Sequence, residues 1–313
     1  MSTTLLKYVT WDVFTKQRFR GNPLAIVSVP EDVVLSQHQR QTVAREFNYS
    51  ETVFIKHIPE NDGDLRSSYV WEVNIHTTSE ELPFAGHPTI GTACYILSAF
   101  PESATCGSLL KVPAGSINID YDAKELSAQA AIPHDVHIHE ATFSDEQIMK
   151  LYSSLRGHAN SVPRRSAVVS IVKGMTFVLV ELGNEEALNA VTTTVQAPEL
   201  KLDPEWDESF VGTYFYWHPN SDDMRLRTRM IEGTLEDPAT GSAACTLAAY
   251  LAISVAKTHS PREYLITQGV EMGRRSDISV TVTLSSSGKQ VERLVLGGHA
   301  VQVMEGNLQM AQH

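Results

Sequence analysis

Two short turns in the sequence combine glycine with polar side chains at the start of an apolar helix. In the first, ELPFAGHPTIGTACYIL, His87 lies between Gly86 and Pro88 where the apolar run begins. Pro88 fits the first turn of a helix, where its missing N–H costs nothing, and Gly86 lets a ligand approach the backbone closely. The turn therefore predicts that His87 and the amides of the helix start meet an anion such as a carboxylate.

The second turn, GTLEDPATGSAAC, carries its own acid. Asp237 precedes a proline within a turn of the expected helix, whose dipole favours the ionised carboxylate. A catalytic role and a plain helix-capping role both fit this position. Thr240, Gly241 and Ser242 follow as candidate binding residues, with Gly241 in the place of Gly86, although Ser242 equally fits an ordinary first-turn residue.

A third candidate, Glu51, lies in FNYSETVFI at the junction of an expected helix and an apolar strand. Partial burial there raises the pKa of a carboxyl toward the range useful for general acid–base catalysis. A solvated loop glutamate is the alternative. Sequence spacing alone cannot place Glu51 beside His87.

The bulk composition excludes several classes of partner. The chain has 313 residues, 42% hydrophobic and 20% charged, with a formal charge of −12. This charge disfavours nucleic acid and anionic membranes, and the basic run Arg225 to Arg229 is typical of one polar strand face. Three cysteines without disulfide or zinc spacing indicate a reducing compartment. Because no signal peptide or spanning segment is evident, we expect a cytoplasmic protein.

No metal site is expected, with one alternative at HDVHIH. His134, His137 and His139 are spaced closely enough to chelate, and His137 and His139 would share one face of a strand. A solvated edge strand explains these histidines as well.

The elements that position these residues indicate an α+β fold. Short alternating runs predict strands, among them LAIVSV, ETVFIKHI, SYVWEVNIHT, SINIDY, TYFYWH and DISVTVTL. Helices are predicted over Ser36–Asn48, from His87 to about Ala99, over Ser144–Leu155 and over Gly241–Lys257.

The length predicts two domains and a cleft between them, and the composition changes near residues 121 to 134. The two glycine turns, Gly86 to Thr89 and Ala239 to Ser242, lie 153 residues apart, which suggests a duplicated half. Chance similarity of two small-residue helices explains this comparison equally well.

Five segments in order resemble the PhzF-like family, the phenazine biosynthesis-like isomerases with the diaminopimelate epimerase fold. They are GNPLAIV from Gly21, NYSET from Asn48, ELPFAGHPTIGTA from Glu81, EDPATGSA from Glu236 and QGVEMGRRS from Gln268. The resemblance implies two pseudo-symmetric halves, each a curved, mostly antiparallel sheet around a central helix. Residues 1–125 would form the first half, joined by the returning strand 298–313, and residues 126–297 the second. A homodimer is implied.

The resemblance also implies a reaction. Glu51 matches the proton-transferring glutamate of a cofactor-free isomerisation, in which a proton leaves one carbon of a small carboxylate-bearing substrate and returns to another. His87 and Asp237 match residues that hold the substrate or shuttle the proton, as does Ser242 in substrate binding. The Gly86 and Gly241 amides and Thr240 contribute at the helix starts, in a cleft between the halves.

The thiol pair of the epimerase branch is missing. Ala85 and Pro238 stand where we expect those cysteines, so two-base inversion by thiols is disfavoured. A fold-retaining protein that binds a small molecule without turnover is the alternative function.

Overall fold

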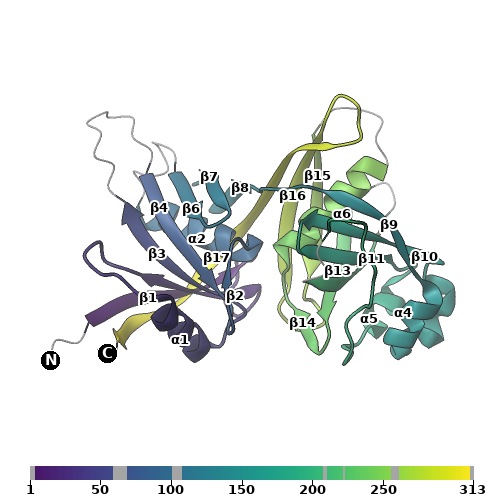
Figure 1. Ribbon diagram of the computed structural model, residues 1–313, viewed down its shortest axis with the longest axis horizontal. Coiled ribbons are helices and arrows are strands. Elements are labelled where there is room, and N and C mark those ends of the chain that lie inside the picture. The colour runs from purple at the N-terminus through teal and green to yellow at the C-terminus, as the bar shows by residue number, and fades with distance from the viewer. Residues whose placement is uncertain are drawn as a thin grey trace. The chain divides into compact units, whose positions relative to one another are not determined.

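The computed structural model describes residues 4–58, 69–100, 108–206, 210–220, 223–254 and 261–310. The chain divides into two compact units, one formed by Met1–Ala131 with Gly297–His313 and the other by Ile132–Leu296. Both are made mainly of strands with few helices (Figure 1), so the α+β fold class is confirmed.

The strands of the first unit close on themselves. β1 pairs with β17 and with β2, and the series continues through β3, β4, β6, β7 and β8, which pairs again with β17. The short β5 extends the edge of β4. The bounds are β1 Thr4–Val13, β2 Asn22–Ser28, α1 Gln37–Phe47, β3 Thr52–Ile58, β4 Tyr69–His76, β5 Glu81–Leu82, α2 Gly86–Ala99, β6 Ser108–Val112, β7 Gly115–Asp122, β8 Ser127–Ala131 and β17 Val291–Met310.

Helix α2 lies inside this barrel. It packs against β1, β2, β3, β7 and β8, and nearly all of its residues are buried. Gly91 permits the close approach, because a Cβ atom there would lie 2.6 Å from Leu24 Cδ2 and 2.7 Å from Val13 Cγ2. The all-round apolar composition of this helix is therefore explained by burial on every side.

The second unit repeats the arrangement. β9, β10, β11, β12, β13, β15 and β16 pair in that order, and α6 packs against β10, β11, β15 and β16. The bounds are β9 His137–Ser144, α4 Asp145–Leu151, the 3-10 helix η1 Ser153–Ser161, β10 Arg165–Val172, β11 Met175–Glu181, α5 Glu185–Ala190, β12 Val211–Trp217, β13 Arg225–Glu232, β14 Leu235–Asp237, α6 Gly241–Ser254, β15 Arg262–Gln268 and β16 Ser276–Leu284. Residues 255–257 of the helix predicted here lie outside the described residues.

The two units share one order of elements. In the first, β2 and β3 are parallel across α1, and β4 and β6 are parallel across α2. In the second, β11 and β12 are parallel across α5, and β13 and β15 are parallel across α6. The other pairings along these series are antiparallel. Shared topology confirms the predicted pseudo-symmetric halves.

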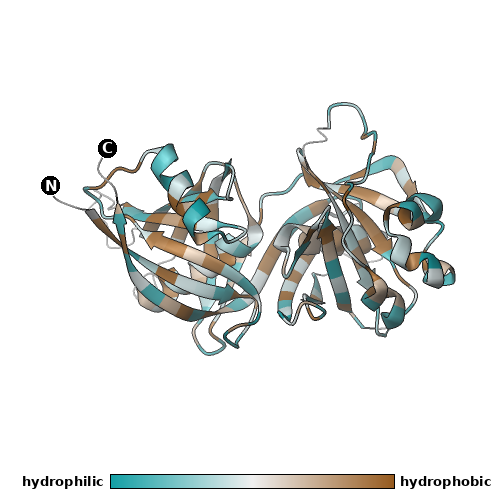
Figure 2. Ribbon diagram, turned by 90° about the horizontal axis from the view of Figure 1, so that it is seen from below, coloured by the Kyte–Doolittle hydropathy of each residue, from teal (hydrophilic) through white to brown (hydrophobic). Residues whose placement is uncertain are grey.

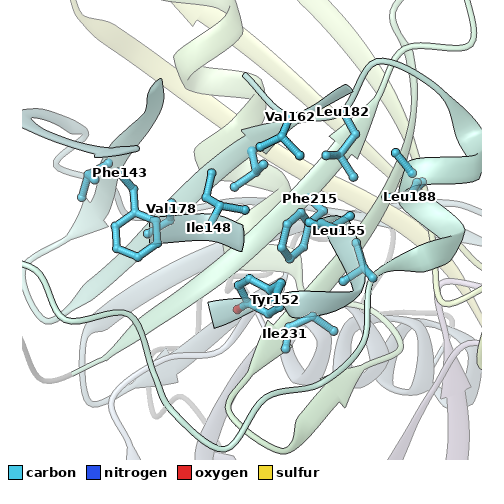
Figure 3. Close-up of a cluster of buried hydrophobic side chains, with 14 of the residues drawn as sticks. Phe143, Ile148, Tyr152, Leu155, Val162, Val178, Leu182, Leu188, Phe215 and Ile231 are labelled. Atoms are coloured by element: carbon cyan, nitrogen blue, oxygen red, sulfur yellow. The ribbon is translucent and has the colours of Figure 1, made fainter. Parts of the chain in front are cut away.

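Apolar and polar residues alternate along some strands (Figure 2), as in β16, so that one face of such a strand packs on the interior. β11 and β12 are buried along nearly their whole length. A further cluster in the second unit packs α4, η1 and α5 onto β11 and β12 (Figure 3). Ile148, Tyr152 and Leu155 contribute the helical side, and Val178 and Phe215 lie on the strands. These helices are thereby fixed against the sheet.

Two sequence-derived details are settled by the packing. Cys94 and Cys245 are free and buried in α2 and α6, whereas Cys106 lies outside the described residues. Arg227 and Arg229 in β13 pair with Glu271 and Glu236, so the basic run is neutralised within the unit.

No helix in the described part of the chain combines the length and apolar composition that crossing a bilayer requires.

Candidate active site

Glu51 is placed by the connection between α1 and β3. Ser36 caps the start of α1 with a reciprocal capping box, and Asn48 ends the helix in the left-handed conformation (φ 53°). The chain then turns through Tyr49 and Ser50 and enters β3 at Thr52. Glu51 is consequently the last residue before a buried strand of the barrel.

His87 is the second residue of α2, and its side chain lies beside that of Glu51. Its Nδ1 atom lies 3.4 Å from Oε2 of Glu51, and the two side chains are only 5% and 17% exposed. Gly86 begins the helix, and Ala85 before it makes no side-chain cap. The fold thus brings together Glu51, Gly86 and His87, which the sequence could not do by spacing alone.

Burial sets the electrostatics of this pair. Desolvation raises the pKa of Glu51 from 4.5 to about 7, against a smaller lowering by a hydrogen bond with the Ser50 side chain. Within the described residues, Oε2 of Glu51 is buried and makes no hydrogen bond. Glu51 is therefore not a solvated loop residue, and its carboxyl can both accept and release a proton near neutral pH.

A buried histidine opposite Thr52 in the sheet contacts side chains of α1 and β5. His76, at the end of β4, is fully buried, with Nδ1 3.3 Å from Oε1 of Gln41 and Nε2 accepting from Nε of Arg40 at 3.3 Å. Desolvation lowers the pKa of His76, and acceptance of a hydrogen bond from Arg40 at Nε2 likewise favours the neutral ring. His76 also pairs with Glu81 across β4 and β5, at the start of the segment leading to His87. The sequence held no signal for this network, because Gln41 and Arg40 lie on a helix with no marked motif.

Asp237 ends β14 and organises the second turn. Its Oδ2 accepts from Oγ1 of Thr240 at 2.5 Å, and its Oδ1 accepts from the amide of Ala239 at 3.4 Å. Thr240 is the residue before α6, so Asp237 does not occupy the helix-capping position itself. Gly241 is buried, and Ser242 is partly buried with its carbonyl accepting from Thr246.

Gln268 holds this turn from β15 and was not singled out from the sequence. Its Nε2 donates to the carbonyl of Asp237 at 2.8 Å and to Oγ1 of Thr240 at 3.0 Å, while its Oε1 accepts from the Tyr214 hydroxyl at 3.0 Å. The next residue, Gly269, has φ of +72°, and a Cβ there would lie 2.6 Å from the carbonyl oxygen of Pro238. The segment QGVEMGRRS therefore packs against the turn of EDPATGSA. The only hint of this contact in the sequence was that both segments belong to the five that resemble the family.

The predicted site residues fall into two groups, one in each unit. Glu51, Gly86 and His87 belong to the first unit, and Asp237, Thr240, Gly241 and Ser242 to the second. Gly86 and Gly241 each begin a helix, and the residues directly before them are Ala85 and Thr240. Neither Ala85 nor Thr240 is a cysteine.

One group among the described residues has the donor types of a metal site, namely His137, His139 and Asp203. His134, the third histidine of the motif, is not part of it, since its ring nitrogens lie 2.8 Å from the carbonyl oxygen of Ile132 and 3.3 Å from that of Val291.

Sequence comparison finds relatives along the whole chain. The family model described as phenazine biosynthesis-like protein matches residues 11–306. An uncharacterised isomerase of Mesorhizobium japonicum is 32% identical, with 96% of this chain and 98% of that protein covered. The trans-2,3-dihydro-3-hydroxyanthranilate isomerase of Pseudomonas aeruginosa is 29% identical, with 96% of this chain and 98% of that protein covered.

Solved structures share the fold. A PhzF-family phenazine biosynthesis protein of Bacillus anthracis superposes with a TM-score of 0.73 at 19% identity, covering 97% of this chain and 99% of the other. A hydroxyproline epimerase of Agrobacterium vitis superposes with a TM-score of 0.58 at 14% identity, covering 98% of this chain and 92% of the other.

Proposed function

The chain belongs to the phenazine biosynthesis-like family, and we propose that it is an isomerase that moves a proton between two carbons of a small carboxylate-bearing molecule. Glu51 is the proposed proton carrier. The reaction needs a group that removes a proton from carbon and then returns it at another position, and a single carboxyl can do both.

The observation that carries this proposal is the burial of the Glu51 carboxyl beside His87, 3.4 Å away, which raises the pKa of Glu51 to about 7. A carboxyl with the usual pKa is a weak base toward carbon acids, whereas one near neutrality is populated in both forms at the working pH. Only 17% of the side chain is exposed, so little water competes with the substrate for the proton.

His87 is proposed to hold the substrate beside Glu51. Its Nδ1 lies 3.4 Å from the carboxyl, and its backbone belongs to the first turn of α2, whose N-terminus favours negative charge. When a proton leaves carbon, negative charge develops on the substrate, and fixed donors at that point stabilise the transition state. Gly86 leaves the backbone accessible there.

Two further observations support a one-carboxyl reaction in this class. Ala85 and Thr240 stand at the equivalent helix starts, so no thiol precedes either helix. The relative from Pseudomonas aeruginosa is named for isomerising trans-2,3-dihydro-3-hydroxyanthranilate. We propose that compound as the first substrate to test, with Asp237, Thr240, Gly241 and Ser242 as further binding residues.

The test is proton exchange followed by NMR. Wild-type protein is incubated in D₂O with trans-2,3-dihydro-3-hydroxyanthranilate and with a panel of small carboxylic and amino acids. We expect one compound to gain deuterium or rearrange, and Glu51→Gln to slow this by about 10²–10⁴-fold.

Glu46→Gln is the matched control, because Glu46 is an exposed residue of α1 and the substitution removes the same charge. It should exchange at the wild-type rate. Equal exchange with wild type and Glu51→Gln would contradict the role of Glu51. If wild type binds a panel compound tightly and neither exchanges nor rearranges it, the chain is a binding protein without turnover.

A further inference from the structure

Three side chains with metal-ligand chemistry meet in the second unit, and none of them belongs to the proposed active site. His137 and His139 lie on one face of β9, as the sequence suggested, with ring centroids 4.7 Å apart. Asp203 reaches them from the segment that follows α5, and its Oδ2 lies 2.7 Å from Nε2 of His137 and 3.7 Å from Nδ1 of His139. The donor atoms of all three residues lie within 4.8 Å of one another.

Hydrogen bonds fix the tautomer of the buried His139. The backbone amide of Asp203 donates to Nδ1 of His139 at 3.3 Å, so Nδ1 carries a lone pair and Nε2 carries the proton. Nε2 therefore donates to Oγ of Ser170 at 2.8 Å, and Ser170 in turn lies 2.7 Å from Oγ1 of Thr176. A ligand histidine typically has its second nitrogen donating to a neighbouring oxygen, as Nε2 does here. A metal ion at Nδ1 would take the place of the Asp203 amide as the partner of that lone pair.

This arrangement leads us to propose that His137, His139 and Asp203 bind one zinc-type divalent transition-metal ion. Two imidazoles and one carboxylate suit such an ion and leave a fourth position for water. Two ligand atoms about 2.1 Å from a tetrahedral zinc ion lie about 3.4 Å apart. The observed 2.7 Å and 3.7 Å from Asp203 to the two histidines lie on either side of that spacing. Binding replaces the proton held between His137 Nε2 and Asp203 Oδ2, and it breaks the hydrogen bond from the Asp203 amide to His139 Nδ1.

The ion would fasten the segment that carries Asp203 to the sheet. That segment already docks through Trp206, whose ring stacks on His137 at 4.6 Å and meets His139 edge-on at 5.5 Å. Asp203 also accepts from the amide of Glu140 in β9. Trp206 lies close enough to report the bound ion by fluorescence.

The test is equilibrium dialysis of the untagged full chain against micromolar zinc chloride, with bound metal counted by mass spectrometry. We expect one ion per chain in wild type and in His38→Ala, which removes an exposed histidine of α1. Asp203→Asn and His137→Gln should each weaken binding at least tenfold. Ser170→Ala keeps all three ligands and should weaken it by roughly 10–100-fold.

Cobalt provides a local readout that does not depend on the ligand variants. Co²⁺ should quench tryptophan fluorescence in wild type and lose most of that effect in Trp206→Phe. Absence of zinc from wild type, or an unchanged affinity in both Asp203→Asn and His137→Gln, would overturn the proposal. So would quenching that is equal in wild type and Trp206→Phe.

Discussion

At the scale of single residues, the site depends on a carboxyl that the fold makes hard to ionise. Glu51 follows a helix ended by a left-handed Asn48 and precedes a strand that is buried from its first residue. Its carboxyl cannot avoid partial burial there, and desolvation raises its pKa to about 7. Burying this carboxyl, which suits it for proton transfer, therefore lowers the free energy of unfolding at pH values where it is ionised.

Glu51→Gln should stabilise the protein at high pH but not at low pH. The pKa of Glu51 is about 7 when folded and near 4.5 when unfolded. Between these values the folded state holds a proton that the unfolded state has lost, so its contribution to stability is present below pH 4.5 and falls as the pH rises through 7. The variant should gain roughly 3 kcal/mol over wild type at pH 8 and almost nothing near pH 4.5. Urea unfolding at both pH values measures this; a gain that does not depend on pH would contradict it.

The sequence identified these residues but not their distances. Glu51 and His87 were found from turn chemistry and family segments, whereas their 3.4 Å separation depends on β3 and α2 meeting in one barrel. Gln268 and Asp203 were missed as partners, because Gln268 in β15 contacts Asp237 from 31 residues away in sequence and Asp203 contacts His137 from 66 residues away. Side-chain pairs that depend on tertiary contact leave little trace in one sequence.

At the scale of elements, caps and periodicity predicted the main helices well. α1 lies within the expected range, and α2 begins at Gly86, one residue before the expected start. The helix expected over Ser144–Leu155 instead ends at Leu151, where Tyr152 leaves the helical region, and η1 follows. Helix α5 and strand β8 were not predicted, because α5 has only six residues and SAQAA in β8 lacks β-branched side chains.

Gly91→Ala tests how closely α2 fits inside its barrel. The new Cβ would lie 2.6 Å from Leu24 and 2.7 Å from Val13, so both neighbours must move. We expect a loss of about 1–3 kcal/mol from overpacking, which exceeds the helix-propensity gain of alanine. Gly157→Ala is the control, since a Cβ there meets nothing within 4 Å. Thermal unfolding of both variants and wild type measures this loss. If Gly91→Ala were as stable as Gly157→Ala, α2 would not be tightly enclosed.

At the scale of the whole molecule, the chain crosses between its units twice. The second unit is the continuous segment 132–296, whereas the first needs residues 297–313 as well as 1–131. Strand β17 pairs with both β1 and β8 and so closes the first barrel. The length and composition predicted two halves, whereas the return of the C-terminal strand to the first half was implied only by the family resemblance.

Fragments should reflect this division. Segment 132–296 should fold on its own with a cooperative thermal transition, because it carries its own core around α6. Segment 1–131 should not fold until residues 297–313 are joined to it by a flexible linker, since β1 and β8 otherwise lose their shared partner. Circular dichroism on heating measures both. A cooperative transition in 1–131 alone would contradict the role of β17.

The most direct test of the account is the ionisation of Glu51 itself, which requires no knowledge of the substrate. Protein labelled with ¹³C at the glutamate side-chain carboxyl is titrated by NMR, and the spectrum of Glu51→Gln assigns the missing signal. The account predicts a carboxyl that titrates with a pKa of about 7. A Glu51 signal that titrates near 4.5 would contradict it, because burial would then not have raised the pKa of this carboxyl and both of its forms would not be populated at neutral pH.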